Sequence, residues 1–336
     1  MALASLGCLR CSKRVEEPLS QPRLTSAPAV PTASRAASAE QVPLREPTQL
    51  LTLPSSAYQA SIFVDSEAVE VLTNNAAYQL VPGREPLRRA LDLGFAATVT
   101  RHSYVYWSKG ALWGAERHAP AAHGPRQIQK LSHQPQRIVS DVTGEAIAWL
   151  DHSEDNRYAL RAPQKDGEKT LYTSPGSIDA LTLIAASVYF VERPDADGWR
   201  IGRVPLSGAA ASFTARKAGR WPAMLSGARE LVYYDGKNRD VIALSLDLQH
   251  ERTLAKGLIC SPLSAVERVV CAAMNGVFEV PGASEPRQLV ASSNLITGLS
   301  SNAERLAFIV DVGGRGQDQL AVKLLPLEPA TGKTPN

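Results

Sequence analysis

Histidines carry the most versatile chemistry in this 336-residue chain, and three of its six lie near one another. His118 and His123 are five residues apart in a segment rich in Pro, Ala and Gly, and His133 follows them. Imidazole is a common ligand of transition metals. Because no carboxylate or cysteine accompanies these histidines at ligand spacing, the pattern favours solvated loop side chains over a metal centre. We expect no metal and no other cofactor.

Other catalytic and ligand motifs are weaker still. Residues 151–155 and 195–198 each group carboxylates, but neither is long enough for a calcium loop, so hairpin turns that favour Asp and Gly explain them better. The sequence contains no Gly-x-Ser-x-Gly nucleophile motif, and no glycine-rich loop that follows a strand and opens a helix. These observations favour a protein that is not an enzyme.

Cysteines give two indications of the compartment. Cys260 and Cys271 lie on successive predicted strands, and a hairpin turning near Ala265 and Val266 would bring them opposite each other. Opposed residues of an antiparallel pair have Cβ atoms about 4.5–5.5 Å apart, so a disulfide is within reach and would fit an oxidising compartment. Two buried free thiols are the alternative, because free cysteine packs well in cores.

The second indication is Cys8, which ends the short apolar segment Met-Ala-Leu-Ala-Ser-Leu-Gly-Cys. This segment resembles the end of a bacterial lipoprotein signal, in which the cysteine receives lipid. It departs from that pattern at Ser5, and it lacks a charged n-region and a full apolar region. A start placed too far downstream would account for both absences, and a plain cytosolic leader is the alternative. Cys8 and Cys11 have CxxC spacing, but no second ligand pair accompanies them.

Strand patterning indicates how the chain is organised. Seven apolar strands recur about 35 to 43 residues apart, the period of a four-stranded propeller blade. They occupy residues 69–73, 104–107, 146–150, 188–191, 231–234, 269–273 and 306–310. Turns such as Asp235-Gly236 and Asn275-Gly276 follow several of them and lead into a second set of apolar strands. The sequence therefore predicts an all-β, seven-bladed β-propeller, with six blades as the alternative.

The two ends of the repeat complete each other. The last blade has no outer strand before the polar tail, whereas residues 48–54 form a strand with no blade of its own. We expect this N-terminal strand to close the ring, which removes free sheet edges. The predicted organisation is a leader over 1–47 that ends in a Pro/Ala/Ser-rich tether, a propeller over 48–327 and a polar tail over 328–336.

One repeat resembles a known type. Residues 299–311 read Leu-Ser-Ser-Asn-Ala-Glu-Arg-Leu-Ala-Phe-Ile-Val-Asp, which is similar to the Ser-Pro-Asp-Gly…Leu-Ala-Phe opening of the WD40-like repeats in TolB-type bacterial propellers. Ser301 and Ala303 replace the Pro and the Gly of that pattern. The resemblance implies a ring fold, frequent export from the cytoplasm, and binding at the axial funnel or the blade tops.

Charge and composition limit the partners. The net charge is +3, from 36 basic and 33 acidic residues without a dense basic block, so a nucleic-acid partner is not expected. No stretch approaches the ~20 apolar residues of a membrane span, which leaves a lipid anchor as the only expected link to a membrane. Trp221 precedes Pro222 at the start of an inner strand, and it is the candidate for stacking on a ligand at one face of the ring.

Three functional hypotheses remain. The first is a non-enzymatic, extracytoplasmic binding or scaffold propeller, monomeric, whose partner is a protein or glycan at one face. The second is a propeller lyase or hydrolase with a scattered site of histidines and acidic residues in the axial funnel. The third is a cytosolic interaction module. Convergence of three or more titratable groups in the funnel would favour the enzyme.

Overall fold

The computed structural model describes residues 46–54, 60–94, 96–118, 123–141, 144–152, 155, 157–165, 167–222, 224–282, 284–313 and 319–328. They belong to one compact unit, Pro43–Asn336. The predicted leader up to residue 45, with Cys8, and the tail from residue 329 lie outside the described residues. No helix in the described part of the chain is long and apolar enough to cross a membrane.

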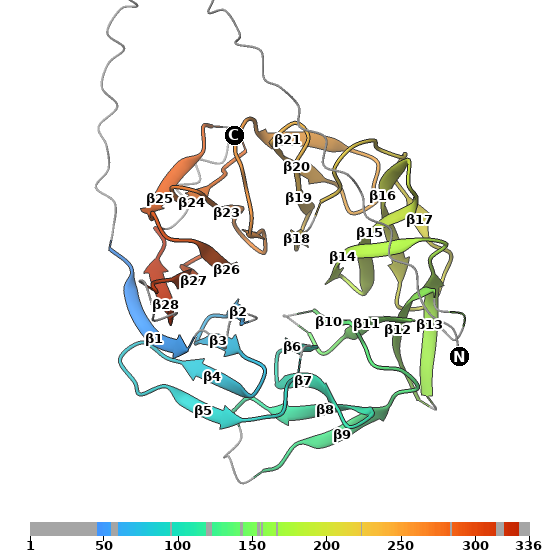
Figure 1. Cartoon of the computed structure of the whole chain (residues 1–336), viewed down its shortest axis with the longest axis horizontal. Helices are drawn as coiled ribbons and strands as arrows, with labels where there is room; N and C mark the ends of the chain where they lie inside the picture. Colours follow the sequence, from blue (N-terminus) through green and yellow to red (C-terminus); the bar gives the residue numbers. More distant parts are fainter. Residues whose placement is uncertain are drawn as a thin grey trace, which may run out of the picture. The chain divides into compact units, whose positions relative to one another are not determined.

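Seven four-stranded antiparallel sheets stand around a common centre (Figure 1). We number these blades 1 to 7 and letter their strands A to D from the centre outward. The first three blades comprise β2–β5 (Ser61–Val64, Val69–Leu72, Ala76–Leu80, Leu87–Ala90), β6–β9 (Ala97–Val99, Ser103–Ser108, Ala111–Glu116, Arg126–Lys130) and β10–β13 (Arg137–Ser140, Ile147–His152, Tyr158–Gln164, Gly167–Thr173).

The next three blades repeat the same order. They comprise β14–β17 (Ser177–Ile184, Ser187–Asp195, Gly198–Pro205, Ser212–Phe213), β18–β21 (Leu225–Gly227, Leu231–Asp235, Asp240–Leu244, Glu251–Ala255) and β22–β25 (Leu263–Ser264, Val270–Ala273, Gly276–Glu279, Arg287–Ala291). All seven strands predicted from the apolar pattern are B strands in the structure. The seven-bladed prediction is confirmed, and the six-bladed alternative is wrong.

Blade 7 closes the ring from both ends of the repeat. It is built from β26 (Ile296–Ser301), β27 (Arg305–Asp311), β28 (Gln319–Pro326) and, outermost, β1 (Thr48–Pro54). Strand β1 runs antiparallel to β28, with Thr48 opposite Leu324 and Pro54 opposite Gln319. The predicted closure by an N-terminal strand is therefore confirmed.

Apolar B strands place the core between neighbouring blades. Strand β27 reads Arg-Leu-Ala-Phe-Ile-Val-Asp, and its five central residues are all buried. Leu306, Phe308 and Val310 pack in a cluster with residues of blade 6, whereas Ala307 and Ile309 pack in a cluster with residues of blade 1. Because side chains alternate across a strand, one apolar run serves both interfaces.

The antiparallel order also determines which connections share a face of the ring. Strands A and C run in one direction and strands B and D in the other, so B–C turns and D–A connections lie at the same ends of the strands. We call this side the B–C face and the opposite side the A–B face. One B–C turn shows how strict the local geometry is. Gly276 has a φ of 144°, and a Cβ atom there would lie 1.9 Å from the Val290 carbonyl oxygen.

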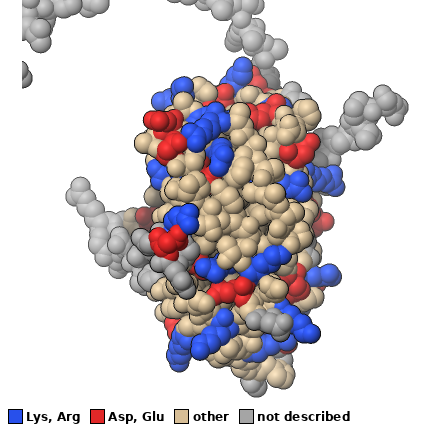
Figure 2. Space-filling model, turned by 90° about the vertical axis from the view of Figure 1, so that its right-hand side faces the viewer, with Lys and Arg blue, Asp and Glu red and all other residues tan. Residues whose placement is uncertain are grey.

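Surface charge is mixed on the side of the rim that Figure 2 shows. On the side of the ring that carries β13 and β16, Lys and Arg are interspersed with Asp and Glu, without a continuous field of one sign (Figure 2). This pattern agrees with the net charge of +3. This side of the rim gives no electrostatic reason to bind a polyanion.

Candidate functional site: the axial channel and a histidine pocket

A channel of about 840 Å³ runs between the inner strands of all seven blades. Each A strand is the edge strand of its sheet, so its outer backbone groups have no sheet partner. Among the described residues that line the channel, Arg137 and Asp141 are the only ionisable ones, Gln136 carries an amide, and the others are apolar or bear a hydroxyl. Burial lowers the pKa of the Arg137 guanidinium although Asp179 lies near it.

Serines of the channel join one blade to the next. The Ser226 hydroxyl accepts a hydrogen bond of 2.9 Å from the Ala265 amide of the following blade. A Leu-Ser pair recurs at this position in blades 6 and 7, and Ser264 accepts in the same way from the Ser301 amide. Ser300 accepts from the Val64 amide at 3.1 Å, across the interface where the ring closes.

These serine hydrogen bonds between neighbouring blades, which we call seams, determine the chemistry of the channel. A hydroxyl that satisfies an edge amide has its geometry fixed by the fold and has no base beside it. The described lining of the channel has two ionisable groups, fewer than the three whose convergence would favour the enzyme hypothesis. The channel can therefore bind through hydrogen bonds and apolar contact, but it has no nucleophile–base pair among the described residues.

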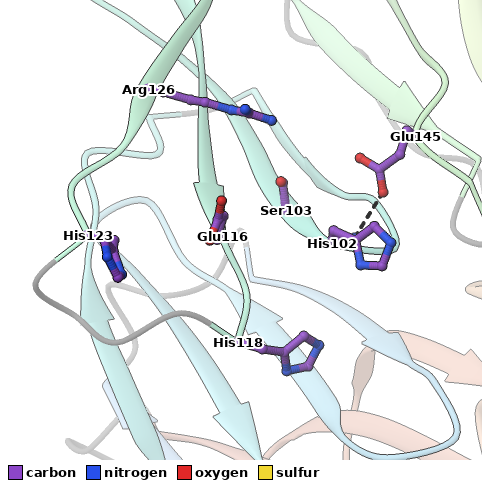
Figure 3. A pocket seen from close by; sticks show the side chains of 7 residues that line it. All are labelled: His102, Ser103, Glu116, His118, His123, Arg126 and Glu145. Atoms are coloured by element: carbon purple, nitrogen blue, oxygen red, sulfur yellow. Dashed lines mark hydrogen bonds between the residues drawn. The ribbon is translucent and has the colours of Figure 1, made fainter.

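A second cavity lies on the A–B face of blade 2. It measures about 640 Å³ and is lined by His102, Ser103, Glu116, His118, His123, Arg126 and Glu145 (Figure 3). In the close-up view, the Arg126 side chain extends across one side, and His118 and His123 stand on the other sides. Strands β7 and β8 supply the cavity wall, while Glu145 comes from the A–B turn of blade 3.

A buried ion-pair network is centred on Arg117, which lies in the sequence between Glu116 and His118, two residues that line the pocket. The Arg117 guanidinium contacts Glu70 at 2.7 Å and also pairs with Asp65, so two carboxylates neutralise one buried cation. The Tyr104 hydroxyl donates to Glu70 at 2.6 Å, and burial together with the Glu70 carboxylate raises the pKa of Tyr104. Burial alone would raise the pKa of Asp65, but hydrogen bonds from the Ala68 amide and from Arg117 lower it.

The pocket brings together residues that the sequence did not connect. His118 and His123, predicted as loop histidines, both line it, whereas His133 does not. Glu145 is held by the His102 amide at 3.0 Å and the Thr100 hydroxyl at 3.1 Å. No group of three or more His, Cys, Asp or Glu residues able to hold a metal occurs in the part of the chain that the structure describes. The absence of a cofactor stays a prediction.

Sequence reasoning missed Glu116, Arg126 and Glu145. Glu116 and Arg126 flank the segment that holds the two loop histidines, so a predicted C–D connection could have indicated their proximity. Glu145 lies on another blade, and only the packing of blade 2 against blade 3 brings it near.

Trp221 lies on the D–A connection between blades 4 and 5. It does not line the axial channel. Its ring is 38% exposed and lies 3.8 Å from the guanidinium carbon of Arg193, a cation–π contact. Its role in binding a ligand stays a prediction.

Cys260 and Cys271 are both buried in the same apolar cluster, and the structure has them as free thiols. Cys271 pairs across the sheet with Leu263, so the hairpin turns later than expected and Cys260 is not the residue opposite Cys271. The two thiols nevertheless interact, and their hydrogen bond together with burial raises the pKa of Cys260. The disulfide stays a prediction.

Comparisons with known proteins show the fold alone. No family model and no curated protein matches the sequence. An oligogalacturonate lyase from Vibrio parahaemolyticus is similar in structure, with a TM-score of 0.58, 10% identity, and coverage of 84% of this chain and 97% of that one. The WD40 β-propeller domain of Doa1 gives a TM-score of 0.53 at 9% identity, covering 84% of this chain and 95% of that one.

A putative TolB from Agrobacterium tumefaciens gives a TM-score of 0.43 at 16% identity, covering 61% of this chain and 80% of that one. The two likenesses with a TM-score above 0.5 show the β-propeller fold and nothing finer. The fold carries both enzymes and binding domains, so function has to be argued from the sites.

Proposed function

We propose that this protein is a non-enzymatic binding propeller whose partner, a protein or a glycan, engages the axial channel and its mouth. The observation that carries the proposal is the composition of the channel. Seven edge strands offer backbone donors and acceptors, yet Arg137 and Asp141 are the only ionisable residues in the part of the lining that the structure describes. Such a lining suits recognition through neutral hydrogen bonds and apolar contact.

We further propose an extracytoplasmic location. Its support is the sequence around Cys8, the Pro/Ala/Ser-rich segment that follows, and the closeness of Cys260 to Cys271. Mass spectrometry of the natively expressed protein tests this part, because it detects lipid on Cys8 and a disulfide in one measurement. An unprocessed N-terminus with two reduced core cysteines would favour the cytosolic module instead.

Site-specific photo-crosslinking in the native host tests the binding region. A photoreactive residue replaces Thr182 or Thr297, which line the channel, or Thr170, an exposed threonine of the outer strand β13. The expected result is a discrete crosslinked product from both channel positions and none from Thr170. Equal labelling at all three positions, or no product from the channel, would contradict the proposal.

The enzyme hypothesis keeps one specific observation in its favour, the histidine pocket. Glu116, Glu145 and three histidines line a single cavity there, outside the funnel where the site was expected. Incubation of the purified protein with oligogalacturonides, with and without manganese, and detection of unsaturated products by ultraviolet absorbance test this hypothesis. We expect no product. Product formation that Glu116→Gln abolishes would replace binding with lyase activity as the function.

A further inference from the structure

Exposed apolar side chains concentrate on the B–C face of the ring. Eight large apolar residues are exposed in the described part of the chain, and two of them, Leu87 and Ile128, lie on outer strands. The other six all lie in connections of the B–C face between blade 4 and blade 7: Trp221, Met224, Ile259, Met274, Leu295 and Val312. Single exposed apolar residues are ordinary, but six on one part of one face are not.

Two of these residues, Met274 and Leu295, lie in loops and are largely exposed to solvent. Met274 lies in the two-residue turn between β23 and β24 and is 84% exposed. Leu295 precedes β26 and is 68% exposed. A side chain of this kind contributes nothing to the core, so its exposure has no structural explanation within the described residues.

Backbone hydrogen bonds and close contacts join these connections into one surface. The Ser261 amide, two residues after Ile259, donates to the Ala272 carbonyl beside the Met274 turn. The Asn275 carbonyl accepts from the Ser292 amide.

The surface continues at both ends. The Leu295 carbonyl accepts from the Asp311 amide, next to Val312. At the other end, Arg220, the residue before Trp221, lies against Gly236 in the β19–β20 turn. The six apolar residues thus follow an arc over consecutive blades.

Basic residues accompany most of this arc. Acidic residues are missing from five of its six connections, whereas the sixth, which holds Val312, follows directly after Asp311. The five connections 214–224, 236–239, 256–262, 274–275 and 292–295 contain six Lys or Arg residues and no Asp or Glu. Four of these cations are exposed and make no side-chain hydrogen bond or ion pair with a described residue: Arg220, Lys237, Arg239 and Lys256. The nearest carboxylates, Asp235 and Asp240, stand at the strand ends, and Asp235 accepts from the Lys237 amide and the Asn238 side chain.

We infer that this apolar-basic surface, defined by the six apolar and four basic residues above, docks onto an anionic lipid bilayer. Separate apolar tips and a Trp insert at the headgroup boundary, and unpaired Lys and Arg meet the lipid phosphates. A protein partner would instead have to supply carboxylates to four separate cations and pockets to several isolated tips. The surface shares Met224 with the lining of the axial channel, but the partner inferred here is a lipid bilayer and not the protein or glycan proposed for the channel, so each proposal is tested by its own experiment.

Vesicle sedimentation of the full chain tests the inference. Cys8→Ser is present throughout, so that an attached acyl chain cannot contribute. The vesicles are phosphatidylcholine alone or phosphatidylcholine mixed with phosphatidylglycerol. We expect binding to the anionic vesicles that weakens with added salt, and a loss of roughly tenfold in affinity for the double variant Met274→Ser/Leu295→Ser.

A second double variant tests the charge, and matched controls test the position. Arg220→Gln/Lys256→Gln should lose affinity by about 25-fold, because each basic residue near an anionic surface contributes roughly fivefold. Leu87→Ser/Ile128→Ser and Arg88→Gln/Lys130→Gln alter exposed outer-strand residues of the same types. The affinity of these controls for the vesicles should be within about twofold of the parent's. All variants should have the same melting temperature as the parent.

Three results would overturn the inference: no binding to anionic vesicles, equal binding to neutral vesicles, or equal losses in the outer-strand controls.

Discussion

Leu53 is the side chain through which β1 closes the ring, and its removal tests that closure. It is 2% exposed and packs in one cluster with Ile62 and Val64 of blade 1 and with Leu320 and Val322 of blade 7. Leu53→Ala leaves a cavity between the first and the last blade. For a fully buried leucine the cost is about 3 kcal/mol of unfolding free energy.

The expected change in melting temperature follows from the size of the unit. The compact unit has about 290 residues, so its unfolding entropy is about 0.6 kcal/mol/K and a loss of 3 kcal/mol lowers the midpoint by about 5 °C. Circular dichroism during heating measures this shift. Leu87→Ala is the matched control, because Leu87 is 45% exposed on an outer strand and should change stability by less than about 0.5 kcal/mol.

Truncation sharpens the same test. Deletion of residues 1–47 leaves β1 intact and should leave a folded ring, whereas deletion through Pro54 removes β1 and exposes the edge of β28. The second truncation should melt at lower temperature and self-associate, as size-exclusion chromatography would show. If Leu53→Ala had the same melting temperature as Leu87→Ala, or if both truncations were equally stable, closure through β1 would not stabilise the ring.

Four further predictions concern the seams, the buried charges and the thiols. Arg117→Met leaves the buried Glu70 and the half-buried Asp65 without their cation and should cost about 3–5 kcal/mol in chemical denaturation. The pKa of Asp65 is lowered in the folded state, so the ionised Asp65 carboxylate stabilises the fold at a pH above the ordinary pKa of aspartate. This stabilisation is lost as the pH falls below about 4, so the melting temperatures of the parent and of Asp65→Asn should converge in acid. Ser264→Ala leaves an edge amide without its partner and should cost about 1 kcal/mol in urea unfolding, with no such loss for an exposed serine. Alkylation of the unfolded, unreduced protein should label neither Cys260 nor Cys271 if they form the predicted disulfide, and full labelling would refute it.

The fold could be predicted because a propeller repeats one local pattern seven times. An apolar B strand, a tight turn and a second apolar strand recur, and the ring follows from their number. Closure could be predicted as well, since the last repeat lacked an outer strand and residues 48–54 had no blade. Register was harder. The hairpin before Cys271 turns later than expected, because the pleated pattern specifies the face of each residue but not the length of the turn.

The candidate sites could not be predicted, because they depend on contacts between blades and a local sequence pattern does not indicate such contacts. Glu145 reaches the histidine pocket from blade 3, and the arc from Trp221 to Val312 spans connections nearly a hundred residues apart. The recurrent Leu-Ser pair was visible in the sequence, but its partner is always an amide of the next blade. Such a signal can be noticed from the sequence and interpreted only in three dimensions.

The same Leu-Ser pair explains why few ionisable residues line the described part of the axial channel. An edge strand near the axis must satisfy its amides, and a serine on the neighbouring blade does so without a charge. A carboxylate in that place would need a cation beside it, as Glu70 and Asp65 have Arg117. Ring closure therefore favours hydroxyls at the seams of the channel and leaves ionisable groups to the outer parts and the two faces. Acid–base chemistry would accordingly arise in the histidine pocket on the A–B face, whereas contact with a charged surface would arise on the B–C face.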